Sequence, residues 1–189
     1  ATNIMRTEVE WMKESIFHRL YDEYHQDVFR FLVYLVKNRT VAEDLSHEVY
    51  VRVLKAYERF ESKSSEKTWL FSIAKNVAID YFRKANVRQR HTFDAFDWEQ
   101  EQLISPTKSP EHFVELSDEM KRLLAVLEQC TGDQKMVIVM RYFQELSVAE
   151  TADILGWTEG KVKTTQHRAI KALREKLNKL EQGRIRYEG

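Results

Sequence analysis

The sequence predicts an all-α protein of two small helical domains joined by a flexible acidic linker, with a helix-turn-helix in the second domain. Three observations support this fold class. The first 131 residues contain no glycine, the only two prolines are Pro106 and Pro110, and 32% of the 189 residues are charged. A β-sheet would need turn glycines and alternating apolar and polar residues, and neither is visible. A chain of this length suits one large domain or two small ones.

The first domain is expected over residues 16–90, behind an N-terminal extension at 1–15 that should be frayed. Apolar residues recur every three or four positions from Ile16 to Val36, which predicts one amphipathic helix. Another amphipathic helix is expected from about Thr68 to Arg83, after a polar break. Its predicted buried side is Leu70, Ile73, Val77 and Tyr81.

Between these two helices the sequence predicts a third, which should begin at Thr40 and end near Phe60. The hydroxyl of Thr40 is expected to cap the helix, and Glu43, three residues on, completes a capping box. The predicted buried stripe is Val41, Leu45, Val49, Val53 and Tyr57.

The charges are unevenly distributed along the chain, although the formal net charge is zero. Residues 75–90 hold five Lys or Arg against one acid, residues 91–120 hold one against eight, and residues 161–189 hold nine against three. Two basic patches can neutralise DNA phosphates, whereas the acidic stretch between them would be repelled by DNA. Residues 91–112 also lose helical periodicity, and we interpret them as the linker.

The second domain is expected over residues 113–180, followed by a C-terminal tail at 181–189. Its first helix is predicted from Phe113 to Glu128. A shorter, mostly buried helix rich in Met, Val and Ile is predicted from Asp133 to Phe143.

The end of this domain has the pattern of a helix-turn-helix. Ser147 and Glu150 predict a capping box, Gly156 should close the short helix, and Thr158 should cap a long basic one. Such a unit lays its second helix in the DNA major groove. An ordinary amphipathic helix with a solvated basic side is the plainer interpretation. The predicted exposed face is Gly160, Lys163, Thr164, His167, Arg168 and Lys171.

Three segments resemble a known family. Residues 42–52 (AEDLSHEVYVR) resemble the core-polymerase-binding helix of extracytoplasmic-function sigma factors, and residues 67–76 (KTWLFSIAKN) resemble their promoter-melting and minus-ten segment. Leu146-Ser147 and residues 160–164 (GKVKT) are similar to the family's reader of the minus-thirty-five element. The overall run is similar to the Bacillus sigma factors that respond to cell-envelope stress. The family usually has glutamine where His47 stands.

The resemblance implies roles for particular residues. Core-polymerase binding is assigned to a polar ridge of Asp44, Glu48 and Arg52. Minus-ten DNA binding is assigned to Ser64, Lys67, Ser72, Lys75, Asn76 and Arg83. Minus-thirty-five binding is assigned to Lys161, Lys163, Thr164, His167, Arg168 and Lys171. Charge alone allows each set to be a solvated helix face, with local ion pairs such as Glu48 to Arg52.

The resemblance also implies the partners: the clamp and flap of core RNA polymerase, promoter DNA, and a membrane-anchored anti-sigma factor. The expected protein is a monomer that initiates transcription of stress or cell-envelope genes. A conventional helix-turn-helix regulator is the alternative, and such proteins usually act as dimers on palindromic sites.

An enzyme is not expected, and neither a cofactor, a metal nor a small-molecule substrate is predicted. His47-Glu48 is not followed by a second histidine one turn on, and Cys130 has no second thiol at metal-ligand spacing. A lone cysteine cannot form an internal disulfide, no apolar run approaches the roughly 20 residues that span a bilayer, and no signal peptide is visible. The expected location is therefore cytoplasmic.

Overall fold

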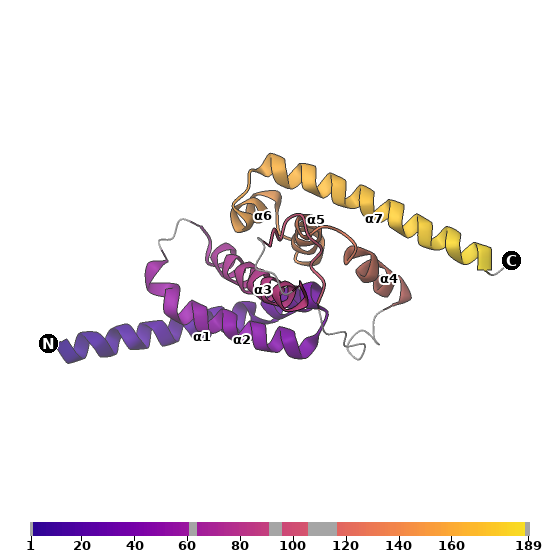
Figure 1. Ribbon diagram of the computed structural model, residues 1–189. Helices are drawn as coiled ribbons and strands as arrows, with labels where there is room; N and C mark the ends of the chain where they lie inside the picture. Colours follow the sequence, from indigo (N-terminus) through magenta and orange to yellow (C-terminus); the bar gives the residue numbers. More distant parts are fainter. Residues whose placement is uncertain (1, 61–63, 91–95, 106–116, 188–189) are drawn as a thin grey trace.

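The computed structural model describes residues 2–60, 64–90, 96–105 and 117–187. Every regular element within these ranges is a helix, as the sequence predicted. The helices of the N-terminal half form one group and those of the C-terminal half another, and the two groups lie against each other (Figure 1). None of the helices in these ranges is long and apolar enough to cross a membrane.

The first helix, α1 (Thr2–Val36), begins well before the predicted Ile16. The residues expected to be a frayed extension therefore continue the helix, whose N-terminal end projects from the rest of the molecule (Figure 1). The second helix, α2 (Arg39–Ala56), packs along α1. Its buried residues are Ala42, Leu45, Val49, Tyr50 and Val53.

The predicted cap of α2 is wrong by two residues. Asn38 is the N-cap, because its extended backbone precedes the first turn and its side chain accepts a hydrogen bond of 3.0 Å from the amide of Val41. Thr40 already lies inside the helix, and Glu43 forms an ion pair with Arg39. Asparagine is at least as good a cap as threonine, and the extended backbone of Asn38 places its side chain before the first turn.

A short 3₁₀ turn, η1 (Tyr57–Arg59), ends α2, and the third helix, α3 (Glu66–Arg90), follows. Ser65 caps α3 through its hydroxyl, which accepts from the amide of Thr68 at 3.1 Å. The helix is buried on more sides than predicted, since it lies between α1, α2 and the C-terminal group. Its fully or nearly buried residues include Phe71, Ala78 and Phe82 as well as Leu70 and Val77.

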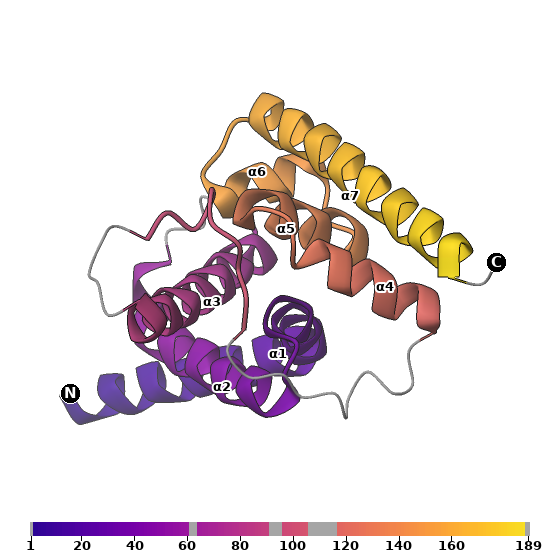
Figure 2. The same cartoon turned by 45° about the vertical axis from the view of Figure 1, so that its right-hand side comes forward.

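The described part of the linker, residues 96–105, packs between the two groups (Figure 2). Leu103 is completely buried there, and Ser105 is nearly so. The predicted linker also includes residues 91–95 and 106–112, which lie outside the described residues. We call residues 96–105 the linker segment.

The C-terminal group begins with α4 (Asp118–Leu127), which is capped by the hydroxyl of Ser117. The predicted start of this helix, at residues 113–116, lies outside the described residues. Next come α5 (Gly132–Ile138) and a π-helical continuation, η3 (Val139–Phe143). These two elements together form the helix predicted from Asp133 to Phe143.

The helix-turn-helix is present as predicted. Ser147 and Glu150 form the capping box of α6 (Val148–Leu155), and Gly156 ends this helix with a left-handed φ of 68°. The hydroxyl of Thr158 then accepts from the amide of Lys161 at 3.1 Å, which caps α7 (Glu159–Tyr187). Helix α7 continues through most of the expected tail, so that it crosses the whole C-terminal group (Figure 2).

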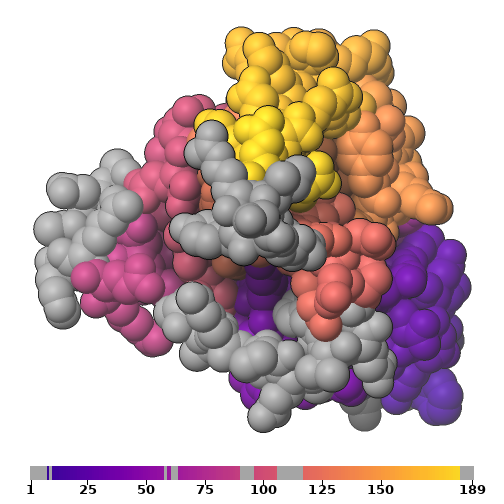
Figure 3. Space-filling view, turned by 90° about the vertical axis from the view of Figure 1, so that its right-hand side faces the viewer, coloured from indigo at the N-terminus to yellow at the C-terminus, as the bar shows by residue number. Residues whose placement is uncertain are grey.

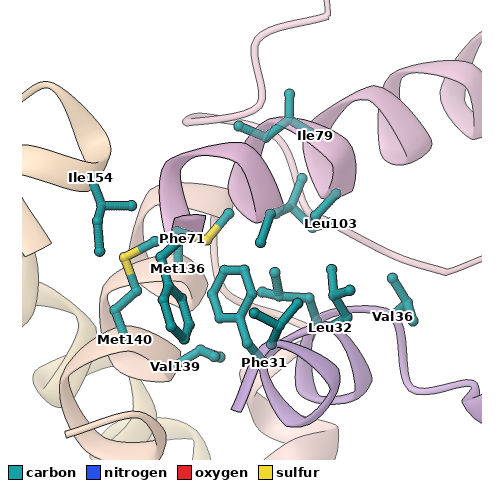
Figure 4. Close-up of a cluster of buried hydrophobic side chains, with 14 of the residues drawn as sticks. Phe31, Leu32, Val36, Phe71, Ile79, Leu103, Met136, Val139, Met140 and Ile154 are labelled. Carbon is teal, nitrogen blue, oxygen red and sulfur yellow. The ribbon is translucent and has the colours of Figure 1, made fainter. Parts of the chain in front are cut away.

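One continuous core joins the two groups of helices. Phe31 of α1 and Phe71 of α3 meet edge to face, and both point toward Met136 and Met140 of α5 and η3 (Figure 4). Leu103 of the linker segment closes the same cluster. The space-filling view shows the orange and salmon surface of the C-terminal half directly against the purple surface of the N-terminal half (Figure 3). The fold is therefore a closed arrangement of the two halves.

A lysine lies inside this core. The side chain of Lys135 is completely buried, and its ammonium group donates to the carbonyl oxygens of Leu35 at 2.8 Å and Leu103 at 2.9 Å. The carboxylate of Glu128 lies 3.9 Å away, and the ring of Phe82 lies 5.6 Å away. A buried charge requires such partners, because an unpaired one is very costly in a medium of low polarity.

Candidate nucleic-acid interface

The exposed face of α7 is the clearest candidate surface. All six residues predicted to share this face are exposed, and the opposite side of the same turns is buried at Val162, Thr165 and Ala169. Packing of those three residues against the rest of the helix-turn-helix fixes the rotation of α7. The face therefore points away from the protein, and it consists of Gly160, Lys163, Thr164, His167, Arg168 and Lys171.

The candidate side chains near the start of α7 are differently engaged. Lys163 lies 3.9 Å from Glu159, and both side chains are largely exposed. Lys161 instead donates to the carboxylate of Glu99 in the linker segment at 2.8 Å and lies 4.0 Å from the centre of the Trp157 ring. Six residues were predicted to bind minus-thirty-five DNA. Within the described residues, Lys161 is the only one of them that contacts the linker segment.

The minus-ten candidates lie on and beside α3. Asn76 is exposed, while Ser72 is half-buried and donates to the carbonyl oxygen of Thr68 at 2.9 Å. Lys75 is also half-buried, and this burial lowers the pKa of its ammonium group, an effect that the negative charge of Glu99 opposes. Lys75 and Asn76 are adjacent in the chain, so the helix turns them in different directions.

The remaining minus-ten candidates flank this surface. Ser64 and Lys67 are half-buried at the start of α3. Arg83 is exposed and pairs with Asp80 one turn earlier, at 2.8 Å. The predicted set is therefore spread over most of α3, and the polar loop before it includes residues 61–63, which lie outside the described residues.

The predicted polymerase-binding ridge is partly used inside the protein. Arg52 donates to Glu48 on its own helix and also to Asp80 of α3, at 3.0 Å. Hydrogen bonds to both carboxylates raise the pKa of Arg52 against the opposite effect of burial. Asp44 is exposed. Arg52 therefore holds α2 against α3, and Asp44 is the ridge residue most available to a partner.

A groove beside this ridge was not predicted. It has a volume of about 510 Å³, and aromatic residues of α1 and α2 line it, with Glu43 and His47 at its edge. The rings of Tyr21 and His25 stack 4.6 Å apart, and Tyr21 meets Tyr50 at 5.0 Å. The hydroxyl of Tyr50 is buried and has no hydrogen-bond partner among the described residues. We call this the α1–α2 groove.

A second groove lies between α4, η3 and α7. It has a volume of about 550 Å³ and is lined by apolar side chains, among them Leu123, Ile170 and Leu177. Tyr142, on its edge, is about half exposed at 51%. We call it the α4–α7 groove. Helical periodicity marks these residues as apolar but does not show that they are left uncovered, so the sequence had no clear signal for either groove.

The sequence matches two family models. Sigma-70 region 2 matches residues 20–88, and Sigma-70 region 4 matches residues 126–175. Among curated proteins, the chain is 46% identical over 167 residues to the ECF RNA polymerase sigma factor SigX of Bacillus subtilis (strain 168), covering 88% of this chain and 86% of the relative. It is 32% identical to the RNA polymerase sigma factor YlaC of the same organism, over 85% of this chain and 91% of YlaC.

Two solved structures share the fold. The sigma factor RpoE in complex with the anti-sigma factor NepR from Bartonella quintana aligns with a TM-score of 0.66 and 23% identity, over 86% of this chain and 96% of that one. CnrH in complex with the cytosolic domain of CnrY aligns with a TM-score of 0.63 and 18% identity, over 87% and 89% of the two chains. At these identities the likeness concerns the fold alone.

Proposed function

This chain belongs to the extracytoplasmic-function family of RNA polymerase sigma factors, and we propose how its surfaces divide the work of such a factor. The factor directs core RNA polymerase to promoters and initiates transcription there. The main support for this assignment of surfaces is the rotation of α7. Its packing buries one side of the helix and leaves six polar or small residues exposed on the other.

We assign minus-thirty-five recognition to the exposed face of α7. Lys163, Thr164 and His167 lie near the capped N-terminal end, which is the end that enters the major groove in a helix-turn-helix. Arg168 and Lys171 follow further along the helix and suit contacts to phosphates. Lysine can donate to guanine O6 and N7, and threonine can contact the methyl group of thymine.

We assign minus-ten recognition and promoter melting to the start and exposed side of α3. Asn76 offers both a donor and an acceptor to an unpaired base, while Lys67, Lys75 and Arg83 supply positive charge for phosphates. A base extruded from the duplex would be held between α3 and the polar loop before it.

We assign binding of the polymerase clamp to Asp44 and the neighbouring α1–α2 groove. Asp44 is exposed and acidic, and the groove beside it offers aromatic surface with an unpartnered hydroxyl on Tyr50. Aromatic side chains are enriched at the centre of protein interfaces, where a buried hydroxyl usually gains a partner. Arg52 supports this surface by pairing with Asp80 of α3, and Glu48 binds Arg52 from within α2.

We assign binding of the polymerase flap to the α4–α7 groove. Its apolar lining and half-exposed Tyr142 suit the apolar side of a partner helix. An anti-sigma factor is proposed to cover the same surfaces. RpoE was solved with the anti-sigma factor NepR, and CnrH with the cytosolic domain of CnrY. Since polymerase and promoter DNA are cytoplasmic in bacteria, we propose a cytoplasmic location. From the resemblance of the sequence to the Bacillus sigma factors that respond to cell-envelope stress, we also propose control of stress or cell-envelope genes.

Transcription in vitro tests the proposal. Core RNA polymerase, genomic DNA fragments and the purified chain should yield transcripts that core polymerase alone does not make. Light scattering should find a monomer, and the chain should be captured by immobilised core enzyme. A dimer that binds palindromic DNA and does not bind polymerase would contradict the proposal and favour a conventional helix-turn-helix regulator.

A further inference from the structure

One carboxylate of the linker segment is paired with Lys161, a lysine at the start of α7 beside the proposed minus-thirty-five face. Glu99 accepts hydrogen bonds from the ammonium of Lys161 on α7 at 2.8 Å and from the indole of Trp157 at 3.2 Å. Its charge also acts on Lys75 of α3, where it opposes the effect of burial on the pKa. A carboxylate therefore lies where Lys161 of α7 would neutralise a phosphate.

The backbone of the linker segment is hydrogen-bonded to the start of α5. The amide of Gly132 donates to the carbonyl oxygen of Glu101 at 2.7 Å, and the amide of Asp133 donates to that of Glu99 at 3.1 Å. The ring of Trp98 stacks on that of Trp157, with centroids 6.1 Å apart and planes at 10°. These contacts hold Glu99 in a defined position beside α7.

The other side of the segment is held by α3. The amide group of Asn86 donates to the carboxylate of Glu101 at 3.1 Å, and the hydroxyls of Tyr81 and Ser105 lie 3.1 Å apart. Leu103 is completely buried in the core shared by both halves. The segment thus bridges α3 and the helix-turn-helix, and both contacts persist only while the two halves stay closed.

Gly132 allows the close contact between the linker segment and the start of α5. A Cβ atom at this position would lie 1.8 Å from the carbonyl oxygen of Trp98, a separation that no side chain tolerates. The atom in the way belongs to the backbone, so a substitution must move the segment away from α5.

We propose that the linker segment is an internal competitor of DNA, whose Glu99 occupies the place of a phosphate at Lys161 in the free chain. The inference rests on the proposed function, because it takes Lys161, which lies beside the assigned face of α7, as a DNA-binding residue. DNA binding is favoured by the counterions that are released when a lysine neutralises a phosphate. A lysine already paired with a carboxylate contributes less to the free energy of binding. Glu99 must therefore leave Lys161 before this lysine binds DNA.

The first test measures affinity of the full chain for a short, mixed-sequence DNA duplex by fluorescence anisotropy at low salt. Glu99→Gln removes the charge and keeps the shape, and Gly132→Ala displaces the segment. Each should bind about two- to five-fold more tightly than the wild type, the range expected for releasing one partly exposed ion pair. Their salt dependence should also steepen by about one counterion.

Gly183→Ala is the matched control, since a Cβ atom there meets nothing within 4 Å. It should bind DNA as the wild type does, and circular dichroism should give equal helicity for all the proteins. If Glu99→Gln and Gly132→Ala both bind DNA like the control, the proposal is overturned.

The second test follows the amide protons of Gly132 and Asp133 by NMR hydrogen exchange. Excess duplex should increase their exchange rates in the wild type, because the segment leaves, and Glu99→Gln should show faster exchange without DNA. Unchanged protection in the DNA-bound chain overturns the inference.

Transcription with core polymerase separates failure of this inference from failure of the proposed function. If the wild-type chain supports transcription while Gly132 and Asp133 stay protected on DNA, only the proposal of an internal competitor is contradicted. If the chain supports no transcription, the proposed function is contradicted, whatever the exchange rates.

Discussion

The ammonium of Lys135 in α5 donates a hydrogen bond of 2.8 Å to the carbonyl oxygen of Leu35, near the C-terminal end of α1. The last carbonyls of a helix have no partner within the helix, so a cation is favourable there. This contact joins the two halves of the chain across a sequence separation of 100 residues. The closed arrangement is thus held by a polar contact as well as by apolar packing.

The stability of the fold should depend on the protonation of Lys135. Burial lowers the pKa of this ammonium group to about 8, below its value of 10.5 in the unfolded chain. Between these two pH values the unfolded state binds more protons, so the free energy of unfolding should rise with pH, by at most about 1.4 kcal/mol per pH unit. Below about pH 8 both states are protonated and this contribution is constant.

Urea unfolding of the wild type and Lys135→Met checks this expectation. The difference in their free energies of unfolding should shift in favour of the wild type between about pH 8 and about pH 9.5. Burial also raises the pKa of Tyr50, but that tyrosine is present in both proteins and cancels in the difference. Parallel pH profiles would contradict the assignment.

Substitutions on α7 should separate base contacts from phosphate contacts. Lys163→Ala and His167→Ala should reduce transcription from minus-thirty-five-dependent promoters and relax base preference there, with about 1–3 kcal/mol of discrimination lost per contact. Arg168→Ala and Lys171→Ala should lower output for all sequences and flatten the salt dependence. Run-off transcription over a library randomised at the minus-thirty-five element, at two salt concentrations, measures both. Equal loss for every sequence in Lys163→Ala would make that lysine a phosphate contact.

Reversing the charge of Asp44 should weaken capture by polymerase without affecting the fold. Asp44 is exposed on α2, so Asp44→Lys should leave the melting temperature close to that of the wild type. Binding to immobilised core enzyme should fall roughly five-fold or more, since like charges at an interface are costly. Glu175→Lys makes the same change of charge on the exposed side of α7 and should bind normally. Equal capture of the two variants would refute the assignment.

The same substitution at two glycines should change stability in opposite directions. Gly156 ends α6 with a φ of 68°, so Gly156→Ala should lower the free energy of unfolding by about 1–2 kcal/mol, although no atom obstructs the new Cβ. Gly160 lies within α7, and Gly160→Ala should raise the free energy of unfolding by up to ~1 kcal/mol. Thermal unfolding of both variants gives the signs, and a stabilising Gly156→Ala would contradict the argument.

Local chemistry determined much of this fold. The capping box at Ser147, the left-handed Gly156 and the cap at Thr158 each depend on residues a few positions apart, and the structure confirms all three. The exposed face of α7 followed from helical periodicity for the same reason. Asn38 shows the limit of such patterns, since it lies two residues before the expected cap and satisfies the same rule.

Tertiary structure decided what depends on contacts between distant segments. Phe71 and Phe82 are buried because α3 faces a second group of helices, and no periodicity within α3 shows which group covers it. The same holds for two contacts of lysine side chains. Glu99 and Lys161 are 62 residues apart in the sequence, and the buried Lys135 is 100 residues from Leu35, whose carbonyl oxygen it contacts. The sequence by itself determined the helices, most of their caps and the exposed face of α7, because these depend on neighbours within one or two turns. Only the packed chain decided which of the charged residues on those helices already have a partner.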